Sequence, residues 1–305
     1  LALAEDIDEV YQAAPLPELL EAEAARYTAA PWLQDMLRGA AGDFAADNSA
    51  TNRYRSTATL LADLRDAMPR IRSSSARLDV LDLSLVVEAE NFRAGSELRA
   101  QLPGSSRHQR VEWLHAAIDA SYGTGAINAR GRTEQQKSLA TLNSAQVPLG
   151  DYLEVLGYLG RVPGWGTQGL RYQFYGSMQK LSDIEPMAMI FIQDQLRGSP
   201  LLVYSQILDS LQRDANMLAG VRHKVFGEEI GVGFRALNPG LARGIRRAPT
   251  DQQGLADFSS DGIYLRPETV SDLPPIAGIM TAGEGNPLSH VQLLARNLGI
   301  PNVGV

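Results

Sequence analysis

The first 226 residues repeat apolar positions with the spacing of an α-helix. Three apolar stripes of this kind are Leu60, Leu61, Leu64 and Met68; Leu78, Leu81, Leu85 and Phe92; and Leu201, Tyr204, Leu208, Leu211, Ala215 and Leu218. Such stripes are typical of helix faces that pack against other helices. We therefore expect an N-terminal all-α bundle with these residues in its core.

Local signals divide this helical region. Ser199 followed by Pro200 predicts a capped helix start, and Pro/Gly-rich breaks occur at residues 102–105, 122–125 and 162–166. The glycines of residues 122–125 are not followed by Gly-Lys-Ser/Thr and no strand precedes them. We therefore interpret this segment as a plain helix–helix connection and not as a phosphate-binding loop.

The pattern changes after Gly227. Glycines become frequent, and residues 262–265 and 276–280 form short apolar runs typical of buried strands. A glycine-rich loop, a short helix and a strand from residue 300 follow. The order predicts a compact α/β layer. We place a helical domain at residues 1–229 and an α/β domain at residues 230–305, with a hinge near residues 227–233.

One histidine lies at the start of the short helix in this second region. Ser289 is a predicted N-cap and Gln292, three residues later, completes a capping box, which puts His290 at the first helical position. Neutral imidazole is a nitrogen nucleophile near pH 7, and unpaired helix amides favour a bound phosphoryl group. A histidine at a helix start is also commonly a capping or surface residue, so this pattern alone leaves both interpretations open.

The same helix has a predicted end and a predicted buried side. Val291, Leu294 and Leu298 fall on one face, which we expect to be buried. Gly299 and Pro301 are typical of a helix C-terminus.

Composition narrows the class of protein. Of 305 residues, 44% are hydrophobic and 21% charged, as in ordinary soluble globular proteins. No apolar run reaches the roughly 18 residues that span a bilayer. The net charge of −7 argues against nucleic-acid binding. The absence of cysteine excludes disulfides, thiol catalysis and cysteine metal sites, and fits a cytoplasmic location.

Other polar residues have simpler explanations. We place His108 and His115 on a surface helix and His223 at the end of a long helix. None of these histidines has metal-ligand spacing, so we expect no metal site. Glu88 and Glu90 interrupt an apolar helix, and we favour a solvated face over an acid/base pair.

Three ordered segments resemble the phosphohistidine (swivelling) domain of the PEP-utilising enzymes, which include PEP synthase, pyruvate phosphate dikinase, glucan water dikinase and the sugar-transport enzyme I. The segments are Asn-Pro-Gly-Leu-Ala-Arg-Gly at residues 238–244, Tyr-Leu-Arg-Pro-Glu-Thr at residues 264–269, and Ser289-His290 with the Ala-Arg and Leu-Gly-Ile-Pro that follow. The resemblance implies that His290 is phosphorylated.

The sequence departs from the family pattern in the histidine loop. Leu288 replaces the usual Thr, and one extra residue follows Thr281, which argues against Thr-based regulation. The Leu-Ser-His-Val run is similar to that of glucan water dikinases. Residues 78–85 and 190–199 are also similar to the helical region that precedes the phosphohistidine domain in those enzymes.

The resemblance also implies surroundings for the histidine. We expect Thr281, Gly283, Gly285 and Ser289 near the phosphate, because hydroxyls donate hydrogen bonds and glycine permits close approach. We expect a docking or supporting role for the remaining candidates, which are Arg266, Glu268 and Arg296.

The implied activity is phosphotransfer by a longer enzyme. An ATP-grasp domain using ATP with Mg²⁺, or PEP as donor, would phosphorylate His290, which would pass the phosphoryl group to a small molecule or a glucan. This chain binds no cofactor in that scheme and is inactive alone. We expect it to be a fragment whose small domain lacks C-terminal strands. An enzyme I-like carrier that phosphorylates a partner protein, and a scaffold with a degenerate phosphohistidine domain, remain as alternatives.

Overall fold

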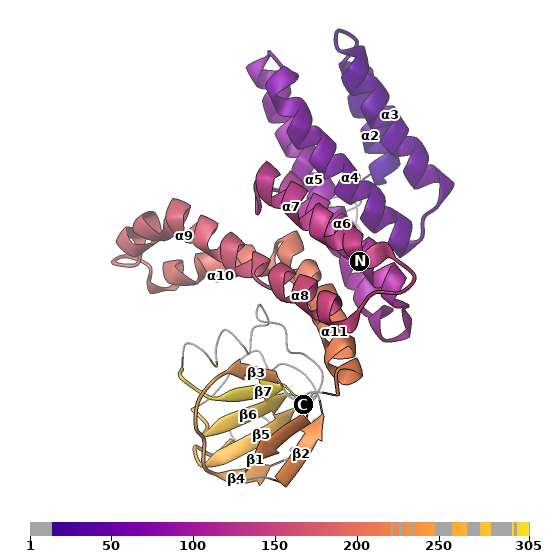
Figure 1. Ribbon diagram of the computed structural model, residues 1–305. Helices are drawn as coiled ribbons and strands as arrows, with labels where there is room; N and C mark the ends of the chain where they lie inside the picture. The colour runs from indigo at the N-terminus through magenta and orange to yellow at the C-terminus, as the bar shows by residue number, and fades with distance from the viewer. Residues whose placement is uncertain are drawn as a thin grey trace, which may run out of the picture.

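The protein consists of a helical part followed by a small mixed β-sheet, as a computed structural model shows (Figure 1). The structure describes residues 14–220, 222–225, 228–232, 235–247, 258–266, 275–281, 295 and 298–304. The predicted fold class, α followed by α/β, is confirmed. Within the described residues, no helix is both long enough and apolar enough to cross a membrane.

The helical part runs from Leu16 to Leu218. Its α-helices are α2 (Leu16–Arg26), α3 (Pro31–Ala46), α4 (Ala50–Ala67), α5 (Ser74–Arg99), α6 (Arg107–Gly123), α7 (Ala129–Ala140), α8 (Leu149–Leu159), α9 (Val162–Leu181), α10 (Phe191–Arg197) and α11 (Pro200–Leu218). Short 3₁₀ turns lie at η1 (Met68–Arg70), η2 (Leu102–Gly104), η3 (Thr141–Asn143) and η4 (Pro186–Ile190). Ser199 caps α11 as predicted, because its side chain accepts a hydrogen bond from the Leu201 amide.

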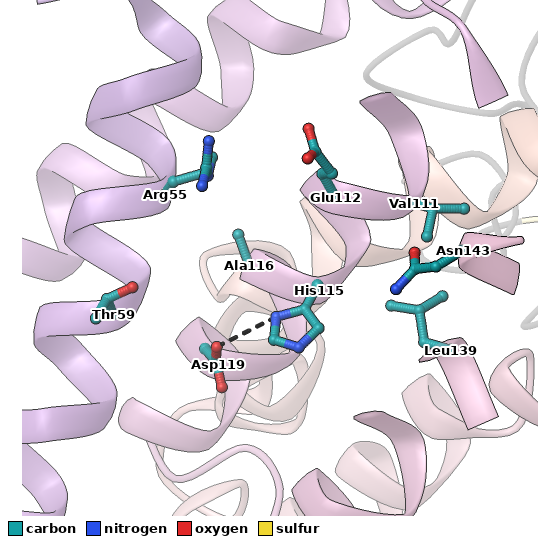
Figure 2. A pocket seen from close by; sticks show the side chains of 9 residues that line it. All are labelled: Arg55, Thr59, Val111, Glu112, His115, Ala116, Asp119, Leu139 and Asn143. Atoms are coloured by element: carbon teal, nitrogen blue, oxygen red, sulfur yellow. Dashed lines mark ion pairs between the residues drawn. The ribbon is translucent and has the colours of Figure 1, made fainter. Parts of the chain in front are cut away.

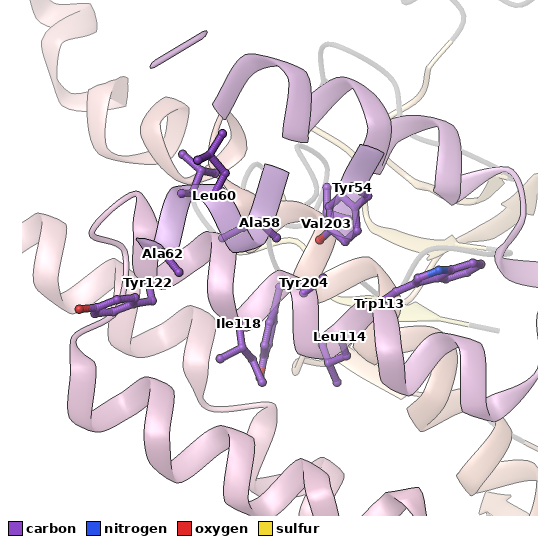
Figure 3. Close-up of a cluster of buried hydrophobic side chains, with 14 of the residues drawn as sticks. Tyr54, Ala58, Leu60, Ala62, Trp113, Leu114, Ile118, Tyr122, Val203 and Tyr204 are labelled. Atoms are coloured by element: carbon purple, nitrogen blue, oxygen red, sulfur yellow. The ribbon is translucent and has the colours of Figure 1, made fainter. Parts of the chain in front are cut away.

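The core lies where α4, α6 and α11 meet (Figure 3). Tyr54, Trp113, Leu114 and Tyr204 are among its largest buried side chains. The predicted stripe on α4 is buried at its three leucines, and the stripe on α11 is buried up to Ala215. Leu218 is exposed because it lies in the last turn of α11.

The predicted core stripe on α5 is wrong. Leu78, Leu81 and Leu85 are exposed, and the opposite side of α5 faces the core through Val80, Leu83, Val87, Ala94 and Leu98. The reason is close packing at Gly95. A Cβ atom there would lie 2.8 Å from Val203 Cγ2 and 3.1 Å from Tyr54 Cε2. Only the side of α5 that carries small residues can approach α4 and α11 this closely.

The predicted surface helix at His108 and His115 is also wrong, since α6 is largely buried. Its core side carries Val111, Trp113 and Leu114, and the two histidines lie on the remaining exposed side. The segment 122–125 connects α6 to α7, as predicted. The predicted break at residues 162–166 is the first turn of α9.

The helices end earlier than the sequence pattern predicts. The last helix stops at Leu218 and is followed by Gly220, which has a φ of +58°. His223 therefore lies in a strand and not at a helix end. This strand, β1 (Arg222–Val225), pairs antiparallel with β2 (Glu228–Val232).

The remaining strands form a five-stranded sheet in the order β3-β7-β6-β5-β4. Their bounds are β3 (Arg235–Asn238), β4 (Ile245–Arg247), β5 (Gly262–Arg266), β6 (Gly278–Thr281) and β7 (Asn302–Gly304). Strands β4 to β7 are parallel, and β3 is antiparallel to β7. The predicted strands at 262–265, 276–280 and from 300 thus correspond to β5, β6 and β7.

One face of the sheet is buried at its central strands β5, β6 and β7. Tyr264, Ile279, Thr281 and Asn302 share that face by their strand register. These side chains are buried, and Ala295 and Ile300 pack with them. Ala295 and Ile300 therefore cover part of this side of the sheet.

We expect the α4–α6 contact to be intolerant of a single methyl group at Gly123. A Cβ atom there would lie 2.5 Å from the backbone carbon of Leu61, so Gly123→Ala should lower the free energy of unfolding by about 1–3 kcal/mol. The control is Gly39→Ala, where no atom lies within 4 Å of the added Cβ. Gly39 is within helix α3, so this change should add roughly 0.5–1 kcal/mol. Equal effects at both sites in urea denaturation would contradict the assignment.

Candidate functional site

The predicted end of the His290 helix is confirmed. Ala295 is helical, Gly299 has a φ of +67°, and the Ile300 amide donates to the Ala295 carbonyl over 2.8 Å. This is the hydrogen bond that closes a glycine-terminated helix. The predicted burial of Leu298 is wrong, because Leu298 lies in the turn and is exposed while Ala295 is buried against the sheet.

Asn238 ties this helix end to strand β3. Its Nδ2 donates to the Ala295 carbonyl over 3.2 Å and to the Ile300 carbonyl over 2.7 Å. A Cβ atom on Gly240 would lie 2.7 Å from Pro301 Cγ, so only glycine permits this approach. Two segments that are distant in the sequence, residues 238–240 and 295–301, thus form one packed unit.

Two of the predicted site residues meet at one edge of the sheet. Thr281 ends β6 and Arg266 ends β5, and their Cα atoms are partners in the parallel register. Carboxyl ends of parallel strands form the edge where α/β proteins commonly bind ligands. The structure describes Arg266 by its backbone only, and it describes the side chain of Thr281 in full.

The buried Thr281 side chain has an amide neighbour. Its Oγ1 lies 3.5 Å from both Asn302 Oδ1 and the Val303 carbonyl oxygen. Asn302 is also buried, and its Nδ2 has no hydrogen-bond partner among the described residues. A buried amide donor usually has a partner. Asn302 was not among the predicted site residues, although a polar residue in an otherwise apolar strand is a usable signal.

The other predicted site residues lie outside the described residues. These are His290, Ser289, Gly283, Gly285, Glu268 and Arg296. The described chain reaches Thr281 before His290 and resumes at Ala295 after it. Both residues are buried, and they belong to the same side of the sheet.

A second site lies in the helical part, where a pocket of about 240 Å³ opens between α4, α6 and α7 (Figure 2). His115 Nδ1 faces Asp119 Oδ2 at 3.5 Å, and the other carboxylate oxygen accepts hydrogen bonds from Arg132 Nε and Gln136 Nε2, each at 2.7 Å. Arg55 lines the opposite wall. The buried Asp119 is therefore held by fixed donors, while His115 remains exposed.

The network around Arg132 extends to the end of α6. Arg132 also pairs with Asp66 at 3.2 Å, and Asp66 accepts a hydrogen bond from the Tyr122 hydroxyl, which raises the pKa of Tyr122. The Tyr122 ring lies near two guanidinium groups, those of Arg65 at 4.4 Å and Arg132 at 4.8 Å. These contacts join α4, α6 and α7, so this network explains the local structure.

Neither of the two glutamates singled out on α5 forms an acid/base pair with the other. Glu90 binds Arg53 at 2.8 Å and Arg93 at 3.0 Å. Burial raises the pKa of Glu88. Within the part of the chain that the structure describes, no cluster of three or more histidines and carboxylates is arranged to hold a metal ion.

We expect Asn238→Ala to loosen the helix end below His290. The change removes both hydrogen bonds to the Ala295 and Ile300 carbonyls and should cost about 1–3 kcal/mol. Hydrogen exchange of the Ile300 and Ile279 amides should accelerate. Asn143→Ala, at an exposed position, is the control and should change stability by less than about 0.5 kcal/mol. Unchanged exchange in Asn238→Ala would show that Asn238 does not anchor the helix.

We also expect Asp63→Asn to stabilise the protein at neutral pH. Burial raises the pKa of Asp63; Asp66 and Asp119 raise it further, while Arg132 lowers it. Because the folded state binds this proton more tightly than the unfolded state, ionised Asp63 destabilises the fold above its folded pKa. The gain in Tm should be largest near pH 7 and vanish below the ordinary aspartate pKa of 3.8. A gain that is constant across this range would exclude titration of Asp63 as its cause.

Thr281, the last residue described before His290, offers a hydroxyl, and Asn302 at the start of the neighbouring strand β7 offers an amide donor. Such neutral donors suit the oxygens of an anionic group without adding charge. Comparisons of the chain with protein-family models, with curated proteins and with solved structures give no match.

Proposed function

We propose that this chain is the phosphoryl carrier of a phosphotransferase, with His290 as the residue that is phosphorylated. The observation that supports the proposal is the packing of residues 238–240 against residues 295–301. Strand β5 belongs to the same sheet. The described residues of the three segments that resemble a phosphohistidine domain therefore belong to one sheet and its cover, which supports the proposal; His290 lies outside the described residues.

Phosphoryl transfer through His290 requires a nucleophilic nitrogen and groups that stabilise the bound anion. The imidazole nitrogen that carries no proton attacks the phosphorus of the donor, the bond from phosphorus to the leaving oxygen breaks, and the proton on the other nitrogen passes to solvent. An oxygen nucleophile of the acceptor then attacks the same phosphorus, the P–N bond breaks, and the acceptor's proton passes to the imidazole, which is restored. The predicted helix start at His290 would stabilise the anion through its amides and its positive dipole end.

The hydroxyl of Thr281 and the amide of Asn302 are buried next to each other on one face of the sheet. The Asn302 Nδ2 is unpaired among the described residues, and we propose that it donates a hydrogen bond to an oxygen of the histidine segment or of the phosphoryl group. In this scheme Gly283, Gly285 and Ser289 permit close approach and donate hydrogen bonds, and Arg266, Glu268 and Arg296 support docking.

The donor and the acceptor are bound elsewhere. Following the resemblance, we propose ATP with Mg²⁺ or PEP as donor, held by an ATP-grasp domain of the same protein. We propose a small molecule or a glucan as acceptor, and a cytoplasmic location. The chain by itself would carry the phosphoryl group and would not complete a catalytic cycle.

The test is phosphorylation of the protein that contains this chain. After incubation with labelled ATP and Mg²⁺, or with labelled PEP, an acid-labile and base-stable label should appear. His290→Ala should abolish it, and the matched control His108→Ala, at an exposed position of α6, should retain it. The chain has four histidines, so peptide mass spectrometry can locate the label. A label that persists in His290→Ala, or that resides on another histidine, would refute the proposal.

A further inference from the structure

Helix α5 carries an unpartnered apolar face that a protein core would normally contain. Leu78, Leu81 and Leu85 are 62%, 47% and 63% exposed. Their spacing of three and four residues places them side by side on one side of the helix, opposite the side that packs on α4. We call these three residues the leucine face. Contiguous exposed apolar residues of this kind mark an interaction surface.

Two acidic residues and one basic residue border the leucine face, and the basic one, Arg77, four residues before Leu81, donates its Nε to the Ile71 carbonyl of its own chain over 2.6 Å. Asp82 follows Leu78 by four residues, and Glu88 follows Leu85 by three, so both border the face. Among the described residues none forms an ion pair with Glu88, and burial raises the pKa of its carboxyl group. A partner that brings a cation would pair with this carboxylate. The face therefore favours a surface that is both apolar and basic.

Helix α9 presents such a surface, with apolar aromatic rings and basic side chains. Its twenty residues include Arg171 and Lys180 and no Asp or Glu, although the whole chain has a net charge of −7. Tyr172 is 93% exposed, and Trp165 and Tyr175 are also exposed. The exposed surface of α9 therefore carries aromatic and basic side chains and no acidic ones.

One side of α9 also leaves room for the side chains of a second helix. Trp165, Gly169, Tyr172 and Gly176 follow one another at spacings of four, three and four, so they share one side, which we call the aromatic face. No atom lies within 4 Å of a Cβ atom built on Gly169 or Gly176. Each glycine leaves a gap beside an aromatic ring. The two gaps are seven residues apart, as are Leu78 and Leu85, which corresponds to about 10 Å on both helices.

Helix α9 packs against its neighbours but leaves most of the aromatic face uncovered; of that face, Trp165 contacts Tyr158 of α8 edge-on, with ring centroids 5.7 Å apart. Gly166 packs against Leu201 of α11 at the start of the helix, and Phe174 contacts Phe191 of α10 with ring centroids 5.3 Å apart. Helix α9 extends to the side of the helical part and does not lie along α5 of its own chain (Figure 1). Its position therefore leaves the aromatic face available to another molecule.

We propose that the leucine face of α5 binds the aromatic face of α9 in a second copy of the chain. The leucines insert beside Gly169 and Gly176, and Lys180 of one copy, four residues after Gly176, lies near Glu88 of the other, three residues after Leu85. Pairing of α5 with α5 is disfavoured, because an antiparallel register that joins Leu81 to Leu85 brings the two Asp82 carboxylates together. The contact joins two different surfaces, so it produces chains or closed rings of copies.

The test uses sedimentation velocity with two complementary variants. The mass of the unaltered chain should rise with concentration and fall back with added salt. Leu85→Glu, which blocks the leucine face, and Tyr172→Glu, which blocks the aromatic face, should each be monomeric. An equimolar mixture of the two should double in mass and grow no further, because each variant keeps one intact face. Leu218→Glu, at an exposed residue away from both faces, should associate like the unaltered chain.

Three results would overturn the proposal. The first is an unaltered chain that stays monomeric into the millimolar range. The second is association that persists in Tyr172→Glu but is lost in Leu85→Glu, which would mean that α5 pairs with itself. The third is a mixture of the two variants that stays monomeric. All substituted side chains are exposed, and circular dichroism will verify that each variant is folded.

Discussion

The close crossing of α4 with α5 and α6 is the constraint on which the helical part depends. Two glycines permit it: Gly123 lies against the backbone of Leu61, and Gly95 lies against Val203 and Tyr54. A side chain at either position would separate the helices by more than the packing around Tyr54, Trp113 and Tyr204 allows. This packing determines which side of α5 is buried and leaves its leucines exposed. The surface available for a second molecule is therefore a consequence of the core.

Polar groups inside the helical part are placed to hold helices together. Asn91 donates to the Tyr54 carbonyl and to Thr57 Oγ1, which links α5 to α4. Arg110 on α6 reaches Ser210 and Asp214 on α11. Asp119 joins α6 to α7 through Arg132 and Gln136. Buried polar groups need such partners, so they act as specific connections between elements that apolar contacts alone would leave less defined.

The sheet holds the two described residues that flank the candidate site at His290, Thr281 and Ala295. Asn238 fixes the end of the helix that is predicted to begin at His290, and Thr281 marks the start of the intervening loop. Strand β7, which closes the described chain, is paired on both sides by β3 and β6. The sheet thus supports both ends of the loop.

The sequence alone determined that helices precede an α/β layer, and it determined a few element ends. Helical periodicity, the Ser199-Pro200 start and the Gly299 end are local signals, since they depend on backbone conformation and on neighbours within one turn. The same local character explains why the three candidate segments at residues 238–244, 264–269 and 286–301 were visible without a structure.

Only the tertiary structure decided which apolar stripe is buried and which polar groups meet. The leucines of α5 have the spacing of a core stripe, yet the approach permitted by Gly95 turns the opposite side inward. The contact of Asn238 with the Ala295 carbonyl spans 57 residues, and that of Thr281 with Asn302 spans 21. Periodicity records that a face is apolar but not what it contacts, because contact depends on how distant segments fit together in three dimensions.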